Sequence, residues 1–201
     1  MDKRQKELVE AKVILLGNSG VGKTSLIKVA TNRNFDDNEK ASTFSSYILK
    51  DVKVKSINYS LNLWDTAGQE QYRSVSNIFF KGSDIAIFVY DITNKQSFND
   101  LNYWIKQLEN TINTENKCVY GIFGNKMDLY KDENFKEKVN EKDAREFAKS
   151  KGIKFATVSA KKDPTNFEEF LIDLVKDASD NILAKSGKLY LKYPKKKKRK
   201  C

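Results

Sequence analysis

A glycine-rich segment near the amino end has residue types and spacing that suit phosphate binding. Residues 17–24 read GNSGVGKT and match the pattern G-x-x-x-x-G-K-[ST]. Glycines let the backbone curl so that successive N–H groups point at phosphate oxygens. Lys23 adds a full positive charge, and the hydroxyl of Thr24 can bind Mg²⁺. The predicted contact residues are Asn18, Ser19, Gly20, Val21, Gly22, Lys23, Thr24 and Ser25.

The segments on either side of this loop fit that interpretation. Residues 13–16 are apolar and suit a buried strand, and residues 25–30 suit the first turns of a helix. The amino end of a helix adds partial positive charge where the phosphates would lie. A chance glycine loop is the alternative, and both flanking contexts argue against it.

A second segment, residues 65–70, reads DTAGQE. Asp65 is placed to hold Mg²⁺ through water, and Gly68 can offer a backbone N–H to a γ-phosphate. Gln69 follows, where its amide could orient an attacking water molecule. D-x-x-G is a weak motif alone, but it gains weight downstream of a phosphate-binding loop.

A third segment, residues 125–128, indicates which base is bound. The carboxylate of Asp128 can accept hydrogen bonds from the N1–H and the 2-amine of guanine. Adenine has an acceptor at N1 and no 2-amine, so it would leave a desolvated carboxylate unpaired. A solvated turn is the alternative reading of these residue types. Further along, Ser159, Ala160 and Lys161 follow the last expected strand, and the N–H of Ala160 could contact guanine O6.

A long polar stretch, residues 31–46, has no periodicity and is expected to be a surface loop. Loops of this length are usually functional or disordered. It contains Thr43, whose hydroxyl could complete the Mg²⁺ shell while its backbone contacts the γ-phosphate.

The elements that must position these segments alternate between strands and helices. Strands are expected at residues 13–16, 47–55, 60–64, 85–90, 118–123 and 154–158, with a hairpin turn at 56–58. A helix is expected to start at Asn140, and another at 164–165, with Glu168 at capping-box distance from Thr165. The last helix should bury Phe167, Phe170, Leu171, Leu174, Val175, Ala178 and Ile182. The pattern predicts an α/β domain: a mostly parallel six-stranded sheet with helices on both faces.

Length and composition predict one domain at residues 11–184, a polar arm at 1–10 and a flexible tail at 185–201. No apolar run approaches the ~20 residues of a membrane span. The charged first ten residues predict no signal peptide. Cys118 lies in an apolar run and is expected to be a buried thiol. A disulfide framework is not expected, which fits a reducing cytosolic location.

The net charge of +10 is concentrated in the tail. Residues 185–201 hold nine basic groups and no acidic one, and the remainder has 28 basic and 27 acidic side chains. A partner that is attracted by this positive charge should therefore bind the tail.

The four segments GNSGVGKT, WDTAGQE, GNKMD and SAK, in this order, closely resemble those of the Ras-like small GTPases. Residues 64–70, 72–74, 79–83 and 90–93 resemble the Rab branch, and the resemblance covers about 11–184. It implies a P-loop G domain that binds GTP or GDP with Mg²⁺, hydrolyses GTP slowly and controls vesicle traffic on the cytosolic face of an endomembrane. Hydrolysis would be an in-line attack of water, accelerated about 10³–10⁵-fold by a partner, because nothing marks an arginine finger in cis.

The resemblance also implies residue roles. Lys23 would bind the β- and γ-phosphates, Thr24 and Thr43 the Mg²⁺, and Gln69 would position water. The base would be held by Asn125 and Asp128, with the stem of Lys126 along it and Phe35 edge-on. An aromatic cluster that reports the nucleotide state maps to Ile48, Trp64 and Phe79. The implied partners of the monomer are an exchange factor, a GTPase-activating protein, effectors and a GDP-dissociation inhibitor.

The chain departs from the family pattern in three places. The interval from Phe35 to Thr43 is one residue longer than usual, so Ser42 competes for the Mg²⁺ role, although the following residues favour Thr43. Ser45 replaces the usual glycine and Ile48 the usual phenylalanine, so the effector surface is unusual. The chain ends in one cysteine, Cys201, in place of two cysteines or a four-residue prenylation box.

The tail supports a hypothesis of a prenylated Cys201, assisted by basic residues on an anionic membrane. The alternatives are a nuclear import signal, because residues 194–200 fit that pattern, or a solvated tail. No interleaved aromatic residues support nucleic-acid readout. Two other functions stay open: a soluble or nuclear GTPase, and a nucleotide-dependent binding module that does not hydrolyse GTP.

Overall fold

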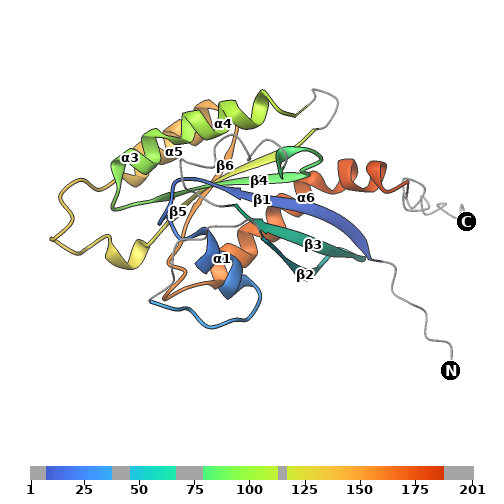
Figure 1. Ribbon diagram of the computed structural model, residues 1–201, viewed down its shortest axis with the longest axis horizontal. Helices are drawn as coiled ribbons and strands as arrows, with labels where there is room; N and C mark the ends of the chain where they lie inside the picture. The colour runs from blue at the N-terminus through green and yellow to red at the C-terminus, as the bar shows by residue number, and fades with distance from the viewer. Residues whose placement is uncertain (1–7, 38–45, 67–78, 113–116, 188–201) are drawn as a thin grey trace, which may run out of the picture.

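The computed structural model describes residues 8–37, 46–66, 79–112 and 117–187. Within them the chain forms a six-stranded sheet of order β2-β3-β1-β4-β5-β6 (Figure 1). Its strands are β1 (Val9–Leu16), β2 (Ser46–Val54), β3 (Ile57–Asp65), β4 (Ile85–Asp91), β5 (Val119–Asn125) and β6 (Lys154–Thr157). Only the β2–β3 pair is antiparallel among these neighbours. The predicted fold class is confirmed.

Helices cover both faces of the sheet. They are α1 (Lys23–Ala30), α3 (Lys95–Asn99), α4 (Leu101–Glu109), α5 (Glu141–Ser150) and α6 (Thr165–Lys185), with a short 3₁₀ helix η2 (Met127–Leu129). Side chains of β1 alternate between two cores: Val13 and Leu15 pack with α1 and α6, whereas Ile14 and Leu16 pack with α4 and α5. Residues 13–16 of β1 are buried on both faces, which explains why this part of the strand is apolar throughout. In Figure 1, α3, α4 and α5 lie along the side of the sheet opposite α1.

The last helix confirms its predicted stripe but not its predicted cap. Its buried residues are the seven that helical periodicity selected. Pro164, rather than Thr165, occupies the N-cap, and no side chain caps α6 within the described residues. Glu168 therefore lies one position too far for a capping box, and its carboxylate lies 2.9 Å from Nζ of Lys50. The start predicted at Asn140 is confirmed, because its Oδ1 accepts a hydrogen bond from the N–H of Lys142 at 2.8 Å.

The β2–β3 hairpin turns earlier than predicted. Val54 pairs with Ile57, so Lys55 and Ser56 alone connect the strands. Lys55 takes a positive φ of 55°, which a two-residue hairpin demands. The prediction of a turn at 56–58 was wrong because Ile57 packs against the core, and this extends the ladder.

Three strands end in polar residues at one edge of the sheet. These residues are Asp65, Asp91 and Asn125, which end β3, β4 and β5. Ligands of α/β sheets bind at such carboxyl ends. None of the helices in the described ranges is long and apolar enough to cross a membrane.

Candidate functional site

A pocket of about 560 Å³ opens at this edge of the sheet. It is lined by the glycine-rich loop, the segment around Phe35, residues 125–129 and residues 160–161. Of the predicted site residues that the structure describes, all line it except Asn18, Val21, Asp65 and Ser159. Thr43, Gly68, Gln69 and Cys201 lie outside the described residues.

Glycine at position 22 joins the two ends of the pocket. Gly22 has a φ of 94°, which disfavours any side chain. A Cβ atom there would lie 2.2 Å from Nδ2 of Asn125. The glycine-rich loop can therefore approach residues 125–128 only because this position carries no side chain.

Lys23 places a buried cation in the pocket. Its side chain is 5% exposed, and Nζ donates hydrogen bonds of 2.9 Å to the carbonyl oxygens of Gly17 and Asn18. Burial lowers the pKa of Lys23 to about 8, and the nearby charge of Asp65 partly opposes this. A desolvated ammonium gains most from an anionic partner, so the pocket favours a phosphate at this point.

Thr24 and Asp65, both predicted as metal ligands, meet beside Lys23. The hydroxyl of Thr24 donates to Oδ2 of Asp65 at 2.6 Å. Hydroxyl and carboxylate oxygens are ligands that Mg²⁺ prefers, and Mg²⁺ commonly uses few protein ligands beside water and substrate phosphates. This pair of oxygen ligands therefore fits Mg²⁺ held together with a phosphate.

Asn125 links three loops at the other end of the pocket. Its Nδ2 donates to the carbonyl oxygen of Val21 at 3.0 Å, and its Oδ1 accepts from the N–H of Ala160 at 3.2 Å. In this structure the N–H of Ala160 therefore faces Asn125. Val21 and Ala160 contribute main-chain atoms that hold the loops together.

The carboxylate of Asp128 is oriented by a neighbouring loop. Oγ of Ser159 donates to Oδ1 of Asp128 at 2.6 Å. Ser159 is buried and positions Asp128, which lines the pocket. Ser159 therefore belongs to the site through its hydrogen bond to Asp128, although it does not line the pocket.

Two further contacts shape the pocket wall that is formed by Phe35, Lys126 and Lys161. Lys126 adopts a left-handed conformation with φ of 69°, and its Nζ lies 2.6 Å from Oδ2 of Asp91. The ammonium of Lys161 lies 5.7 Å from the ring centre of Phe35 and pairs with Asp37. Such cation–ring contacts hold an aromatic ring in place.

Sequence reasoning missed five residues of this site. Asp36, Asp37, Thr66 and Leu129 line the pocket, and Asp91 anchors Lys126. A signal existed for Asp91, because it ends a buried strand at the same edge as Asp65 and Asn125. Hydrogen bonding holds Thr66, whose hydroxyl donates to the carbonyl oxygen of Leu15 at 2.5 Å.

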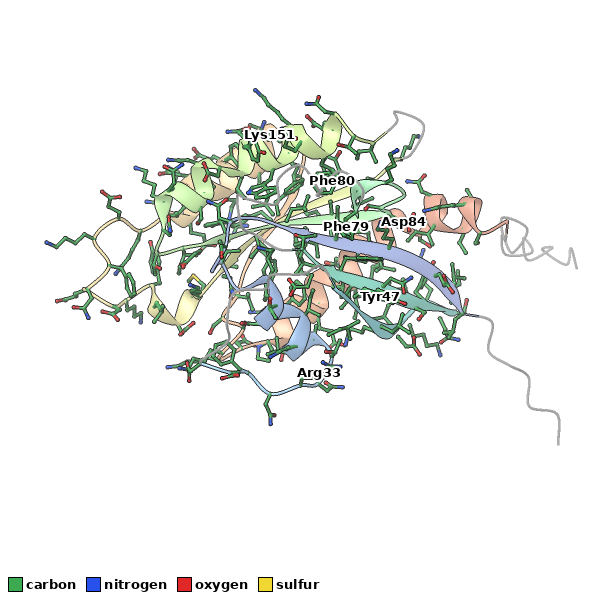
Figure 2. All side chains as sticks on the ribbon, viewed as in Figure 1. Arg33, Tyr47, Phe79, Phe80, Asp84 and Lys151 are labelled. Carbon is green, nitrogen blue, oxygen red and sulfur yellow. The ribbon has the colours of Figure 1, made fainter. Side chains whose placement is uncertain are left out.

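The predicted aromatic cluster is wrong at one position. Tyr47 pairs with Trp64 in the sheet, and their rings lie 5.0 Å apart, while Trp64 and Phe79 lie 5.7 Å apart. Ile48 packs into the opposite core, because neighbouring strand residues face opposite sides. The cluster is therefore Tyr47, Trp64 and Phe79 (Tyr47 and Phe79 are labelled in Figure 2).

Comparison with known proteins agrees with this geometry. The Ras family model matches residues 12–180. The chain belongs to the Ras family. It is 39% identical over 174 residues to Ras-related protein Rab-21 of Geodia cydonium, covering 87% of this chain and 73% of that protein. It is 37% identical over 171 residues to Ras-related protein Rab-7a of Paramecium octaurelia, covering 84% and 81%.

A human relative gives the same result. Ras-related protein Rab-30 of Homo sapiens is 32% identical over 176 residues, covering 86% of this chain and 83% of the relative. Ras-family membership confirms the predicted resemblance and the predicted enzyme class, a small GTPase. It also accounts for a pocket that combines the glycine-rich loop with the carboxylate of Asp128.

Proposed function

We propose that this Ras-family protein is a Rab-type switch that binds GTP or GDP with Mg²⁺, hydrolyses GTP slowly and regulates vesicle-mediated transport. The observation that carries the proposal is that one pocket is lined by Lys23, Thr24 and Asp128, with Asp65 bonded to Thr24. A phosphate chain and a base can be bound at its two ends at once. The whole nucleotide can therefore be bound in this one pocket.

In the proposed mechanism the protein acts by binding and orienting. Lys23 would neutralise charge on the β- and γ-phosphates, while Thr24 and Asp65 would hold Mg²⁺, which supplies further charge neutralisation. Gln69 would orient the attacking water, and Gly68 would donate its N–H to the γ-phosphate. Loss of that phosphate would release the segments carrying Thr43 and Gly68, which changes the surface that effectors recognise.

Base selectivity gives the sharpest test of this proposal. Asp128 accepts from the N1–H and 2-amine of guanine, whereas xanthine carries a carbonyl oxygen in place of the amine. We expect Asp128→Asn to weaken GDP binding by about 100-fold and to improve XDP binding. Titration calorimetry of both nucleotides checks this. Equal affinity of the parent protein for ADP and GDP would contradict the assignment.

The corrected aromatic register bears on the switch residue. Counting back from Tyr47 instead of Ile48 gives Ser42 the place in the family pattern that Thr43 otherwise holds, whereas the residues that follow favour Thr43. Ser42 therefore competes with Thr43 for the Mg²⁺ role. Measuring Mg²⁺-dependent GTP hydrolysis of Ser42→Ala and Thr43→Ala side by side separates them, since the true ligand should show the larger loss.

We further propose that the tail attaches the protein to the cytosolic face of an endomembrane. A prenyl group on Cys201 would supply one anchoring signal and the basic residues, attracted to anionic lipid, the second. Family membership supports this, together with the end of α6 at Lys185, where the tail begins. Flotation of the lipid-modified parent and of Cys201→Ser with anionic vesicles tests it. Unchanged membrane binding of the variant would rule out the prenyl anchor, whereas no binding by either protein would favour a nuclear or soluble role.

The proposed partners follow from the switch. They are an exchange factor, a GTPase-activating protein, effectors and a GDP-dissociation inhibitor, with the chain itself a monomer. The predicted G-domain limits, 11–184, stay a prediction; β1 starts at Val9 and α6 ends at Lys185. A pulldown with the GTP-bound protein against the GDP-bound protein would identify the effectors.

A further inference from the structure

The side chain of Asn18 is directed away from the pocket, although its loop forms part of the pocket wall. Nδ2 of Asn18 donates to Oδ2 of Asp100 at 2.6 Å, and Oδ1 accepts from Nε1 of Trp104 at 2.9 Å. The carbonyl oxygen of Asn18 accepts from Nζ of Lys23 at 2.9 Å. One residue therefore contacts the pocket cation through its main chain and the α3–α4 segment through its side chain.

Both side-chain partners are held firmly by the fold. Trp104 is 3% exposed and belongs to the core under α4. Asp100 lies at the junction of α3 and α4, and its other oxygen, Oδ1, accepts from Nε2 of Gln96 at 2.7 Å. The two partners are one helical turn apart, so they present a fixed acceptor and a fixed donor to the loop.

The chemistry of these partners selects an amide at position 18. An indole N–H can only donate and an ionised carboxylate can only accept, so the residue between them needs one acceptor and one donor. A carboxylate at position 18 would still accept from Trp104. It would also face the carboxylate of Asp100 at hydrogen-bond distance, where like charges repel.

We propose that Asn18 is a positioning residue that clamps the phosphate-binding loop to the start of α4 and thereby slows release of the bound nucleotide. The inference rests on the proposed function, because it concerns the same pocket. A loop that shifts away from α4 carries the carbonyl oxygen of Asn18 with it and so moves Lys23. A change that displaces α4 relative to this loop should therefore speed nucleotide exchange.

The test exchanges donor and acceptor between the two positions in the full chain. Each protein is loaded with a fluorescent GDP analogue and Mg²⁺, and release is followed after adding excess GDP. Asn18→Asp should release the analogue about tenfold or more faster. Adding Asp100→Asn restores one donor and one acceptor in the reverse order, and should bring release back to within about threefold of the parent. Asn102→Asp, the same change at an exposed position of α4, should leave the rate unchanged.

A second measurement reads the clamp without nucleotide release. The indole N–H of Trp104 should exchange slowly with solvent in the parent and the double variant, and faster in Asn18→Asp, by NMR. If Asn18→Asp does not fold, Trp104→Phe, which removes the donor together with the pyrrole part of the buried ring, should speed release by about threefold. These experiments separate the two ideas. A parent protein that does not retain the analogue overturns the proposed function, whereas a parent that retains it and an unchanged rate in the folded variants overturns the clamp.

Discussion

The proposed phosphate side of the pocket, around Lys23, and its proposed base side, around Asn125 and Asp128, are built in different ways. On the phosphate side, Lys23 bonds to carbonyl oxygens only five and six residues away. On the base side, Asn125 reaches a carbonyl 104 residues away, and Ser159 holds Asp128 across 31 residues. The contacts of Lys23 lie within one local turn of the chain, whereas those of Asn125 and Asp128 form only when distant strands are in place.

This difference separates two kinds of effect. Loss of the Lys23 charge should change nucleotide affinity with little effect on folding, because Lys23 bonds to carbonyl oxygens of its own loop. Damage to the base side should lower affinity and stability together, because the same hydrogen bonds join β5, the glycine-rich loop and the loop after β6. Four experiments test the contrast.

The largest effect is expected from Lys23→Met, which keeps much of the stem and removes the charge. Affinity for GDP should fall by about 100-fold or more, since a buried charged partner of phosphate is lost. The melting temperature without nucleotide should change little, because relief of the desolvated ammonium offsets the loss of its two hydrogen bonds to the carbonyls of Gly17 and Asn18. Calorimetry and thermal melting check the two arms, with Lys106→Met at an exposed position of α4 as the control. A melting temperature that drops as steeply as affinity would contradict the local character of this half.

Asn125→Ala should give the clearest double effect. It leaves the carbonyl of Val21 and the N–H of Ala160 without their present partner, and Asn125 is only 2% exposed. We expect about 2–4 kcal/mol loss in the free energy of unfolding and at least about tenfold weaker GDP binding. Urea unfolding monitored by circular dichroism gives the first number. Weaker GDP binding with an unchanged free energy of unfolding would show that the hydrogen bonds of Asn125 do not stabilise the fold.

Ser159→Ala should give a smaller and more selective effect. Removing the hydroxyl takes one donor from Asp128 and leaves the phosphate side intact. GDP affinity should fall about three- to tenfold, while affinity for inorganic pyrophosphate, which lacks a base, should not change. Equal losses for both ligands would mean that the two halves are not separable.

The smallest change is expected at Cys118, which precedes the strand that ends in Asn125. Burial raises the pKa of the Cys118 thiol to about 12, so little thiolate forms at pH 8.5. Because the unfolded thiol ionises first, stability from this group is complete below about pH 8.5 and declines as pH rises toward 12. In a Cys201→Ser background, alkylation by iodoacetamide at pH 8.5 should be slow until urea unfolds the chain. Faster alkylation in Asn125→Ala, but not in Ser159→Ala, would extend the contrast into β5.

Much of the fold could be predicted because its signals are local and periodic. The buried stripe of α6 follows from helical spacing, and the order of strands and helices implies a mostly parallel sheet. Errors occurred where a residue's neighbour is set by a distant segment. Glu168 pairs with Lys50 of β2, and Ile57 extends a ladder instead of turning.

Within the pocket, the sequence alone predicted the phosphate-binding role of the glycine-rich loop and the base-binding role of Asp128. The local geometry of the loop follows from its own residues, since six residues or fewer separate Lys23 from the carbonyls that it contacts. Tertiary structure decided that Tyr47 rather than Ile48 stacks on Trp64, that Asp91 anchors Lys126, and that the side chain of Asn18 joins α4. The physical reason is the distance along the chain between the residues that make each contact. A short turn is specified by its own glycines and lysine, whereas strand register and helix placement depend on how the whole sheet packs.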